Sequence, residues 1–263
     1  MGSGSRPLIQ IKQVSISFHH KNIRNQVLQQ ISLDINRGEI VSILGESGCG
    51  KSTLLNIIGG FEKADEGQVL LDGNTVNQPS RKCVMLFQDY GLLPWRSVIK
   101  NVELGLEGLK LSAAERKERA LHYLDLVGLS GKEGLLPNEL SGGMKQRVGI
   151  ARALSLQPEV ILLDEPFAAL DTFNRYNLQN ELLRIQHAEK TTMVLVTHDI
   201  DEAIYLSDRV YIMQSNPGHV QKELKISLSK PRDRNHQEFQ NYRRIVFDHF
   251  HMNQSDLVLE YSS

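Results

Sequence analysis

The sequence predicts an α/β fold with a mainly parallel core sheet, an antiparallel β subdomain and an inserted helical subdomain. The first observation behind this prediction is a set of nearly continuous apolar runs, which are typical of parallel strands buried on both faces. Each run leads into polar residues, and the runs cover 40–44, 84–87, 160–163 and 193–196. The second observation is a glycine-rich loop that joins the first run to an apolar segment of helical character. Because ligands bind outside the carboxyl ends of such strands, we expect the functional site there.

The glycine-rich loop has the sequence Gly45-Glu46-Ser47-Gly48-Cys49-Gly50-Lys51-Ser52-Thr53 and matches the phosphate-binding pattern G-x-x-x-x-G-K-S/T. Its glycines allow backbone N–H groups to turn inward around phosphate oxygens. Lys51 adds a positive charge between the β- and γ-phosphates, and the Ser52 hydroxyl suits a Mg²⁺ ion. The full match between a strand and a helix favours nucleotide binding over a glycine-rich turn with a chance lysine.

The composition is that of an ordinary globular protein. The 263 residues suffice for one large α/β domain or two small ones, and 40% are hydrophobic and 23% charged. A formal net charge of -1 creates no global positive field toward nucleic acid or anionic lipid. No apolar stretch approaches the roughly 20 residues that span a bilayer, and residues 1–7 are expected to be a flexible N-terminus without a signal peptide. Cys49 and Cys83 form no disulfide framework, which favours a cytosolic location.

The sequence before and after the loop predicts β-structure. Strands are expected over 8–18, 31–35 and 68–71, some of them antiparallel, and Asp72-Gly73 is typical of a hairpin turn. Phe18 closes the first strand. Its ring either stacks on an adenine ring or belongs to the core.

A helical pattern follows, which predicts a helical subdomain over about 96–156 within a domain that spans 8–226. Ser112 and Glu115 have the spacing of a capping box at the start of one helix, and Gly128 is a plausible C-cap at its end. The segment lacks extended heptads, which argues against a long coiled-coil insert.

Later elements are predicted in the same way. Helices are expected over 141–153 and 199–206, and a strand over 209–213. Residues 227–263 are interpreted as a C-terminal helical extension. Its cationic side chains are interpreted as a solvated helix face packed on the domain rather than as a specific anion site. They are Lys230, Arg232, Arg234, Arg243 and Arg244.

Polar side chains at the strand ends indicate phosphoryl-transfer chemistry. Asp164 and Glu165 are adjacent on a strand end, so they point in opposite directions and serve different tasks. We expect Asp164 to hold Mg²⁺ and Glu165 to polarise the water that attacks the γ-phosphate. Gln88 would position this water or the metal, and His198 would contact the γ-phosphate. Together with Lys51 they form the predicted catalytic set.

A second anion-binding nest is predicted at Ser141-Gly142-Gly143, at the start of a helix. The chain already has one phosphate loop. If the two nests lie too far apart in one subunit to touch the same nucleotide, the second must serve a partner molecule. Two subunits would then pair head to tail with two nucleotides between them.

Taken in order, these motifs resemble the ATP-binding subunits of ABC transporters over nearly the whole chain. They are the phosphate loop, Gln88, Leu140-Ser141-Gly142-Gly143-Met144, Asp164-Glu165, Ala169-Leu170-Asp171 and His198. The resemblance implies the P-loop NTPase fold of the ABC ATPases, with ATP and Mg²⁺ as ligands. It also implies that Phe18 takes the adenine-stacking position, where the family more often has tyrosine, and that Asp171 links the two sites across the dimer.

Three shorter motifs resemble the importer group for nitrate, sulfonate, taurine and bicarbonate. They are Leu92-Leu93-Pro94-Trp95, Asn216-Pro217-Gly218-His219-Val220 and Pro231-Arg232-Asp233-Arg234. This resemblance implies a subunit that hydrolyses ATP to energise uptake of a small anion through a separate membrane permease, supplied by a substrate-binding protein. The subunit would lie peripherally on the cytoplasmic side of the membrane, as a homodimer or paired with a paralogue. Trp95 either lies near the permease or belongs to the core.

A soluble ABC ATPase that acts on nucleic acid or ribosomes is the main alternative function. A long coiled coil, tandem cassettes or a basic stripe would favour it, and the sequence has none of these. A binding-only subunit is disfavoured because Lys51, Glu165 and His198 are all present.

Cys49 is also expected to be reactive. It lies near a helix N-terminus, which lowers the pKa of a thiol. We therefore expect alkylating reagents to modify it and MgATP to protect it.

Overall fold

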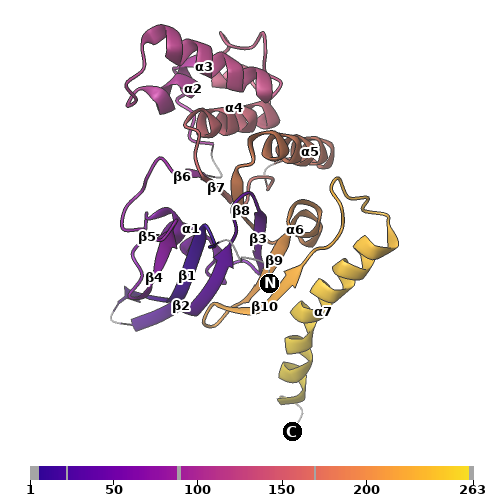
Figure 1. Cartoon of the computed structure of the whole chain (residues 1–263). Helices are drawn as coiled ribbons and strands as arrows, with labels where there is room; N and C mark the ends of the chain where they lie inside the picture. Colours follow the sequence, from indigo (N-terminus) through magenta and orange to yellow (C-terminus); the bar gives the residue numbers. More distant parts are fainter. Residues whose placement is uncertain (1–5, 22, 88–89, 169, 261–263) are drawn as a thin grey trace.

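The computed structural model describes residues 6–260 except 22, 88, 89 and 169. Its central element is a six-stranded sheet in the order β10-β9-β3-β8-β7-β6 (Figure 1). Pairing is parallel from β9 to β6, and β10 is antiparallel to β9. The strands are β3 Ile40–Gly45, β6 Cys83–Leu86, β7 Val160–Asp164, β8 Thr192–Thr197, β9 Arg209–Gln214 and β10 His219–Lys225. All four apolar runs form strands of this sheet, so the predicted parallel core is confirmed.

Alternation of side chains along each strand divides the core between the two faces of this sheet. On one face, Ile40 and Leu44 of β3 pack with the helices that follow residue 97. On the other face, Val41 and Ile43 pack with α1 (Lys51–Gly59) and with a smaller sheet. The same alternation occurs in β7, β8 and β9. Because both faces are covered, the strands are apolar at nearly every position, which explains the uninterrupted runs in the sequence.

The smaller sheet is antiparallel and has the order β2-β1-β4-β5 (Figure 1). Its strands are β1 Ile9–His20, β2 Ile23–Ile35, β4 Glu66–Leu71 and β5 Asn74–Thr75. Asp72 and Gly73 connect β4 to β5 with φ angles of 49° and 78°. Both residues are in the left-handed region, as a two-residue hairpin turn of type I′ requires. The predicted turn is therefore confirmed.

Three helices form the upper lobe in Figure 1. They are α2 Val98–Leu106, α3 Ala113–Leu126 and α4 Gly142–Ser155, with a short 3₁₀ turn at Pro137–Glu139. The capping box at the start of α3 is confirmed, because Glu115 N–H donates to Ser112 Oγ at 3.2 Å and Ser112 N–H donates to Glu115 Oε2 at 2.7 Å. Gly128 follows the helix end with a φ of 68°, which is typical of a C-cap glycine.

The loop between β6 and α2 is organised by Asn101, which is fully buried. Its Nδ2 donates to the carbonyl oxygens of Leu93, Arg96 and Ser97 at 3.1, 2.8 and 3.1 Å. Its Oδ1 accepts a hydrogen bond from Leu93 N–H at 2.8 Å. Both ends of the amide thus fix the loop to the start of α2. Trp95, within this loop, is 73% exposed, so the alternative that it belongs to the core is wrong.

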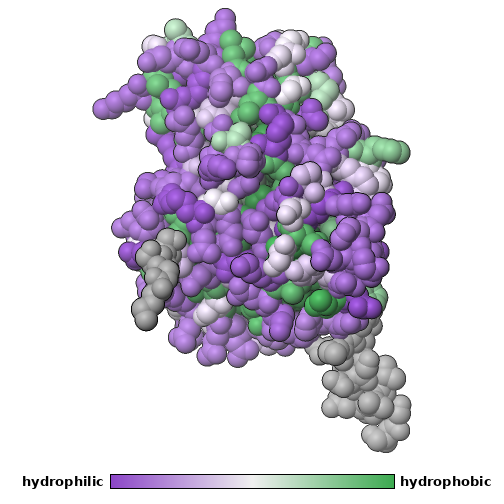
Figure 2. Space-filling view, turned by 45° about the vertical axis from the view of Figure 1, so that its right-hand side comes forward, coloured by the Kyte–Doolittle hydropathy of each residue, from purple (hydrophilic) through white to green (hydrophobic). Residues whose placement is uncertain are grey.

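On the face of the molecule that Figure 2 shows, large hydrophobic patches are few. That face is mostly hydrophilic, and its hydrophobic residues lie in separate small patches. Among the helices of the described ranges, none combines the length and the hydropathy that a membrane span requires.

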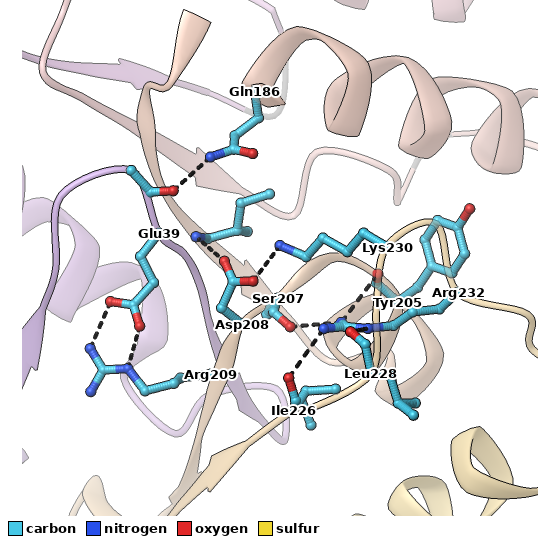
Figure 3. A network of polar contacts seen from close by, with 12 residues as sticks. Glu39, Gln186, Tyr205, Ser207, Asp208, Arg209, Ile226, Leu228, Lys230 and Arg232 are labelled. Atoms are coloured by element: carbon cyan, nitrogen blue, oxygen red, sulfur yellow. Dashed lines mark hydrogen bonds and ion pairs between the residues drawn. The ribbon is translucent and has the colours of Figure 1, made fainter. Parts of the chain in front are cut away.

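The second half of the chain adds α5 Thr172–Glu189, α6 Ile200–Leu206 and α7 Gln237–Glu260, and α7 extends away from the body at its far end (Figure 1). Arg232 joins the segment before α7 to α6 (Figure 3). Its guanidinium donates to the carbonyl oxygens of Ile204, Tyr205 and Ser207 at the C-terminal end of α6. It also donates to carbonyl oxygens of its own segment, at residues 226 and 228. The residue is 6% exposed, and burial lowers its pKa to about 10.

The neighbouring cations are also engaged. Lys230 Nζ lies 2.7 Å from Asp208 Oδ1, and the guanidinium carbon of Arg234 lies 3.6 Å from the ring centre of Tyr205. The interpretation of a solvated helix face is therefore wrong for Arg232 and Arg234. These residues precede α7, and their partners lie on other elements. Backbone hydrogen bonds place Arg232, whereas ring stacking and a hydrogen bond to Gln179 Oε1 place Arg234, and sequence spacing reveals none of these contacts.

We predict that Arg232→Ala lowers the free energy of unfolding by about 2–4 kcal/mol, because it leaves several buried carbonyl groups without a donor. Arg243→Ala is the matched control. Its side chain is 54% exposed and pairs with Asp201, so a loss of only about 0–1 kcal/mol is expected. Urea unfolding followed by circular dichroism measures both values. Equal losses for the two variants would show that the carbonyl contacts contribute nothing.

Candidate nucleotide-binding site

The loop between β3 and α1 has a backbone that requires glycine at several positions. Gly48 and Gly50 have φ angles of 84° and 97°, in the left-handed region. A Cβ atom on Gly50 would lie 2.6 Å from Leu28 Cδ2, and one on Gly45 would lie 2.7 Å from the Met213 carbonyl oxygen. On Gly48 such an atom would meet no described heavy atom within 4 Å. The loop is therefore closely packed on its inner side and open at Gly48, as a cradle for phosphate oxygens must be.

Lys51 lies against the same loop. It is 4% exposed, and its Nζ donates to the carbonyl oxygens of Gly45 and Glu46, both at 2.7 Å. Among the other predicted loop residues, Glu46 and Ser47 are exposed and Thr53 is half-buried in the first turn of α1. The positive charge is thus held at the loop and not in open solvent.

The carboxyl end of β7 meets the start of α1. Ser52 Oγ donates to Asp164 Oδ1 at 3.0 Å. Burial raises the pKa of Asp164 above its ordinary value, although the hydrogen bond from Ser52 opposes this rise. A hydroxyl and a carboxylate side by side are oxygen ligands of the kind that Mg²⁺ prefers, so these residues fit that ion. Gln88, the third predicted metal ligand, lies outside the described residues, as does Ala169.

Glu165, the residue after Asp164, contacts His198. Its Oε1 lies 3.3 Å from His198 Nδ1, and its N–H donates to the Val196 carbonyl oxygen at 3.0 Å. The φ of Glu165 is 43°, a left-handed conformation that is uncommon for a residue other than glycine. Strained backbone of this kind clusters at functional sites. The two adjacent carboxylates therefore have different partners, which agrees with the expectation that they serve different tasks.

The predicted second nest lies at the start of α4. Ser141 caps the helix, since its Oγ accepts a hydrogen bond from Met144 N–H at 3.3 Å. This helix packs with α2 and α3 in the upper lobe, whereas the phosphate loop follows β3 in the central sheet (Figure 1). A Cβ atom on Gly142 would lie 3.6 Å from Leu170 Cδ2, and one on Gly143 would meet no described heavy atom within 4 Å. The nest is thus open at Gly143 and borders the loop that precedes α5.

Asp171 caps α5. Its Oδ1 accepts from Asn174 N–H at 3.1 Å and its Oδ2 accepts from Asn174 Nδ2 at 2.6 Å. Phe173, two residues later, is 83% exposed. An acidic cap and a solvent-exposed aromatic ring therefore stand together at the start of this helix.

Phe18 is 42% exposed near the end of β1, where it pairs with Asn25 of β2. The same strand, β2, supplies Leu28, which packs on the phosphate loop at Gly50. Phe18 thus belongs to the sheet that borders the loop, and it is not a core residue.

Two side chains that the sequence analysis did not single out, Arg175 and Glu202, contact the residues next to His198 in the chain. Thr197 Oγ1 donates to Glu202 Oε2 at 2.7 Å and accepts from Asp199 N–H at 3.0 Å. Asp199 Oδ1 in turn accepts from Glu202 N–H at 3.0 Å. Glu202 is 6% exposed, and burial raises its pKa to about 7. In the sequence, Asp199 and Glu202 have the spacing of a capping box, which would have predicted a local contact and not one with Thr197.

The expectation that Cys49 is reactive is wrong. The residue is 1% exposed, and burial raises the pKa of its thiol more than the charge of Lys51 lowers it. We predict that iodoacetamide modifies Cys49 in the folded chain more slowly than in the chain unfolded in guanidinium, by about tenfold or more. Peptide mass spectrometry measures the two rates separately from those of Cys83. Equal rates would contradict the buried position.

Glu202 should make stability depend on pH. Its pKa is about 7 in the folded chain against an ordinary value of 4.5, so between these values the folded state binds the proton more tightly than the unfolded state. The contribution of Glu202 to stability therefore falls as pH rises through this interval. Glutamine does not ionise. We therefore predict that the free energy of unfolding of Glu202→Gln, relative to that of the parent, rises by on the order of 1–3 kcal/mol between about pH 4.5 and pH 7.5. Urea unfolding at both pH values tests this, and a difference independent of pH would contradict it.

Comparisons with known proteins agree with this site. The family model described as ABC transporter matches residues 28–168. The chain is 44% identical to the aliphatic sulfonates import ATP-binding protein SsuB of Bacillus thuringiensis subsp. konkukian, over 92% of this chain and 95% of the relative. It is 45% identical to the nitrate import ATP-binding protein NrtD of Synechococcus elongatus, over 79% of this chain and 77% of the relative.

A solved structure agrees as well. The dimeric post-hydrolysis structure of the ATP-binding cassette MJ0796, bound to ADP and Pi, matches with a TM-score of 0.74 and 35% sequence identity. The match covers 84% of this chain and 100% of that chain. The family match spans the phosphate loop, the second nest and the end of β7. The chain therefore belongs to the ABC transporter family, and within it to the ATP-hydrolysing subunits.

Proposed function

We propose that this chain is the ATP-binding and ATP-hydrolysing subunit of an importer that energises uptake of a small anion through a separate membrane permease. One observation carries the proposal: a phosphate loop, a hydroxyl–carboxylate pair and the Glu165–His198 pair meet where neighbouring strands end. Relatives named for the import of sulfonates and nitrate support an importer. These names do not favour the alternative of a soluble ATPase acting on nucleic acid or ribosomes.

In this proposal the loop holds the nucleotide. The backbone N–H groups of the loop and the Nζ of Lys51 bind the phosphates of ATP, and Phe18 stacks on the adenine ring. Ser52 and Asp164, together with Gln88, would hold Mg²⁺. When bound, this ion neutralises phosphate charge. The hydrogen bond between Ser52 and Asp164 supports this assignment because it brings two oxygen ligands to one place.

Glu165 is proposed to polarise the attacking water. Phosphoryl transfer depends mainly on positioning, so the carboxylate must be held in one orientation. The left-handed backbone of Glu165 and the contact with His198 at 3.3 Å both restrict it. His198 would in addition contact the γ-phosphate, and Gln88 would help to place the water.

The working unit is proposed to be a dimer. The nest at Ser141-Gly142-Gly143 would bind the γ-phosphate of an ATP held by the partner subunit, and Asp171 would link the two sites across the interface. The exposed ring of Phe173 beside Asp171 supports contact with a second protein surface at this point. The partner is a second copy of this chain or a paralogue.

The permease is proposed to contact the loop that Asn101 organises. Trp95 offers it a large aromatic surface on a backbone fixed by four hydrogen bonds. The subunit would then lie peripherally on the cytoplasmic side of the membrane, and a substrate-binding protein would deliver the anion. The importer group that the sequence motifs resemble transports nitrate, bicarbonate and sulfonates such as taurine, so one of these anions is the proposed substrate.

We predict that Glu165→Gln lowers ATP hydrolysis on the order of 10²–10³-fold, because it removes the group that polarises water. ATP binding should persist, since the loop and Lys51 are unchanged. In this variant ATP should convert a monomer into a dimer, as size-exclusion chromatography with light scattering would show. Glu181→Gln is the matched control, because its carboxylate contacts Arg184 on the same helix, and it should hydrolyse ATP at the parental rate.

Either of two results would contradict the proposal. Parental hydrolysis by Glu165→Gln would remove the water-polarising role of this residue. A monomer with ATP bound, with binding verified by a fluorescent ATP analogue, would contradict pairing through the second nest.

A further inference from the structure

Arg175 lies near the start of α5 and contacts groups on two other segments. Its Nη2 donates to the Leu170 carbonyl oxygen at 3.3 Å. Its Nη1 lies 3.3 Å from Asp199 Oδ2, and its Nε lies 3.7 Å from Glu202 Oε1. One guanidinium therefore joins the loop that precedes Asp171 to the start of α6.

The two carboxylates belong to a ring of hydrogen bonds around His198. Thr197 precedes His198 and donates to Glu202, and Asp199 follows His198 and accepts from the Glu202 backbone. Asp199 N–H closes the ring by donating to Thr197 Oγ1. The backbone on both sides of His198 is thus fixed by groups that Arg175 contacts.

The contacts of Arg175 are long for a charged donor. Tight charge-assisted hydrogen bonds measure about 2.7–2.9 Å, and all three contacts exceed this length. Its Nε is buried and has no hydrogen-bond partner within the described part of the chain. Leaving a buried donor unpaired is costly, so a movement that shortens the Nε–Glu202 distance is favourable. An approach of less than about 1 Å between α5 and α6 would complete the bond.

We propose that Arg175 is a positioning residue that makes the placement of His198 depend on the loop at Leu170 and Asp171. The inference rests on the proposed function, in which Asp171 faces a partner subunit. When the partner fixes Asp171, the adjacent Leu170 carbonyl group is fixed with it, and Arg175 carries the change to Asp199 and Glu202. In the closed dimer Arg175 then holds His198 at its contact with Glu165, which measures 3.3 Å in the single chain. Arg175 itself touches no reacting atom.

The test compares substitutions at two arginines of α5 in the purified full chain. Arg175→Met removes all three contacts at similar side-chain length, and Arg175→Lys keeps the charge but does not bridge three groups. Arg184→Met is the matched control, since Arg184 contacts Glu181 and the Leu126 carbonyl oxygen. We expect Arg175→Met to lower kcat for ATP hydrolysis about 10- to 100-fold, with KM for ATP within about threefold of the parent. Arg175→Lys should stay within about threefold of Arg175→Met, and Arg184→Met should keep parental values.

A double substitution tests the route through Glu202. If Arg175 acts through this carboxylate, the loss of kcat in Arg175→Met with Glu202→Gln is smaller than the product of the two single losses, by about threefold or more. In the Glu165→Gln background, Arg175→Met should still form the ATP-dependent dimer. Losses that multiply, loss of the dimer, or recovery of parental kcat in Arg175→Lys would each overturn the positioning role.

The outcomes also separate this inference from the function on which it rests. If the parent hydrolyses ATP and Glu165→Gln dimerises while Arg175→Met keeps the parental kcat, only the positioning role fails. If the parent does not hydrolyse ATP and Glu165→Gln does not dimerise, the proposed function fails and the inference fails with it. Thermal unfolding of each variant shows whether it is folded. If Arg175→Met does not fold, the kcat of Arg175→Lys is compared with that of the parent instead.

Discussion

Each central strand of the parallel sheet packs apolar side chains on both of its faces, so a polar side chain can meet a ligand only where a strand ends. Within β3, Ser42 is an exception that needs a partner, and its hydroxyl lies 2.5 Å from that of Ser207. Elsewhere the constraint collects the polar groups at one edge. Asp164 ends β7, Glu165 follows it, and His198 follows the neighbouring strand β8; Asp164 contacts Ser52 just after the phosphate loop. The chemistry of the chain is concentrated there because the sheet offers no other place for it.

Two buried cations away from the strand ends are each satisfied by specific partners. Lys51 is bound by two loop carbonyl oxygens and Arg232 by the carbonyl groups at the end of α6. The pKa of Arg232 is lowered by burial yet stays at about 10, so the side chain remains charged at neutral pH. Glu202 is different, because its pKa of about 7 leaves it partly protonated there. Carbonyl dipoles at a helix end stabilise a cation well, whereas one hydroxyl and a distant guanidinium stabilise a buried carboxylate less.

Much of the fold follows from patterns that act over short distances. The apolar runs, the Asp72-Gly73 turn and the Ser112 capping box depend on neighbouring residues, and all of them were predictable. The phosphate loop was predictable for the same reason, since its glycines and Lys51 are contiguous.

Features that depend on distant partners were not predictable. Arg232 binds carbonyl groups 25 to 28 residues away in the sequence. Asp199 caps the Glu202 N–H as the spacing predicts, but the Glu202 side chain accepts from Thr197 Oγ1. Cys49 shows the competition of two effects, because the helix N-terminus favours a thiolate but burial of the side chain outweighs it. Sequence position indicates the first effect, and only packing reveals the second. Trp95 is exposed because Asn101 holds its loop on the surface, which no apolar pattern predicts.

Arg232 recognises backbone atoms and no side chain of α6. Its partners therefore need to keep a helical path and a C-terminal end in the right place, and this contact makes no demand on their side chains. During divergence of related proteins, such a contact would tolerate drift at residues 204, 205 and 207 but not loss of the arginine. An alignment would then show one invariant position without a covarying partner, although the interaction that keeps it invariant is as specific as an ion pair.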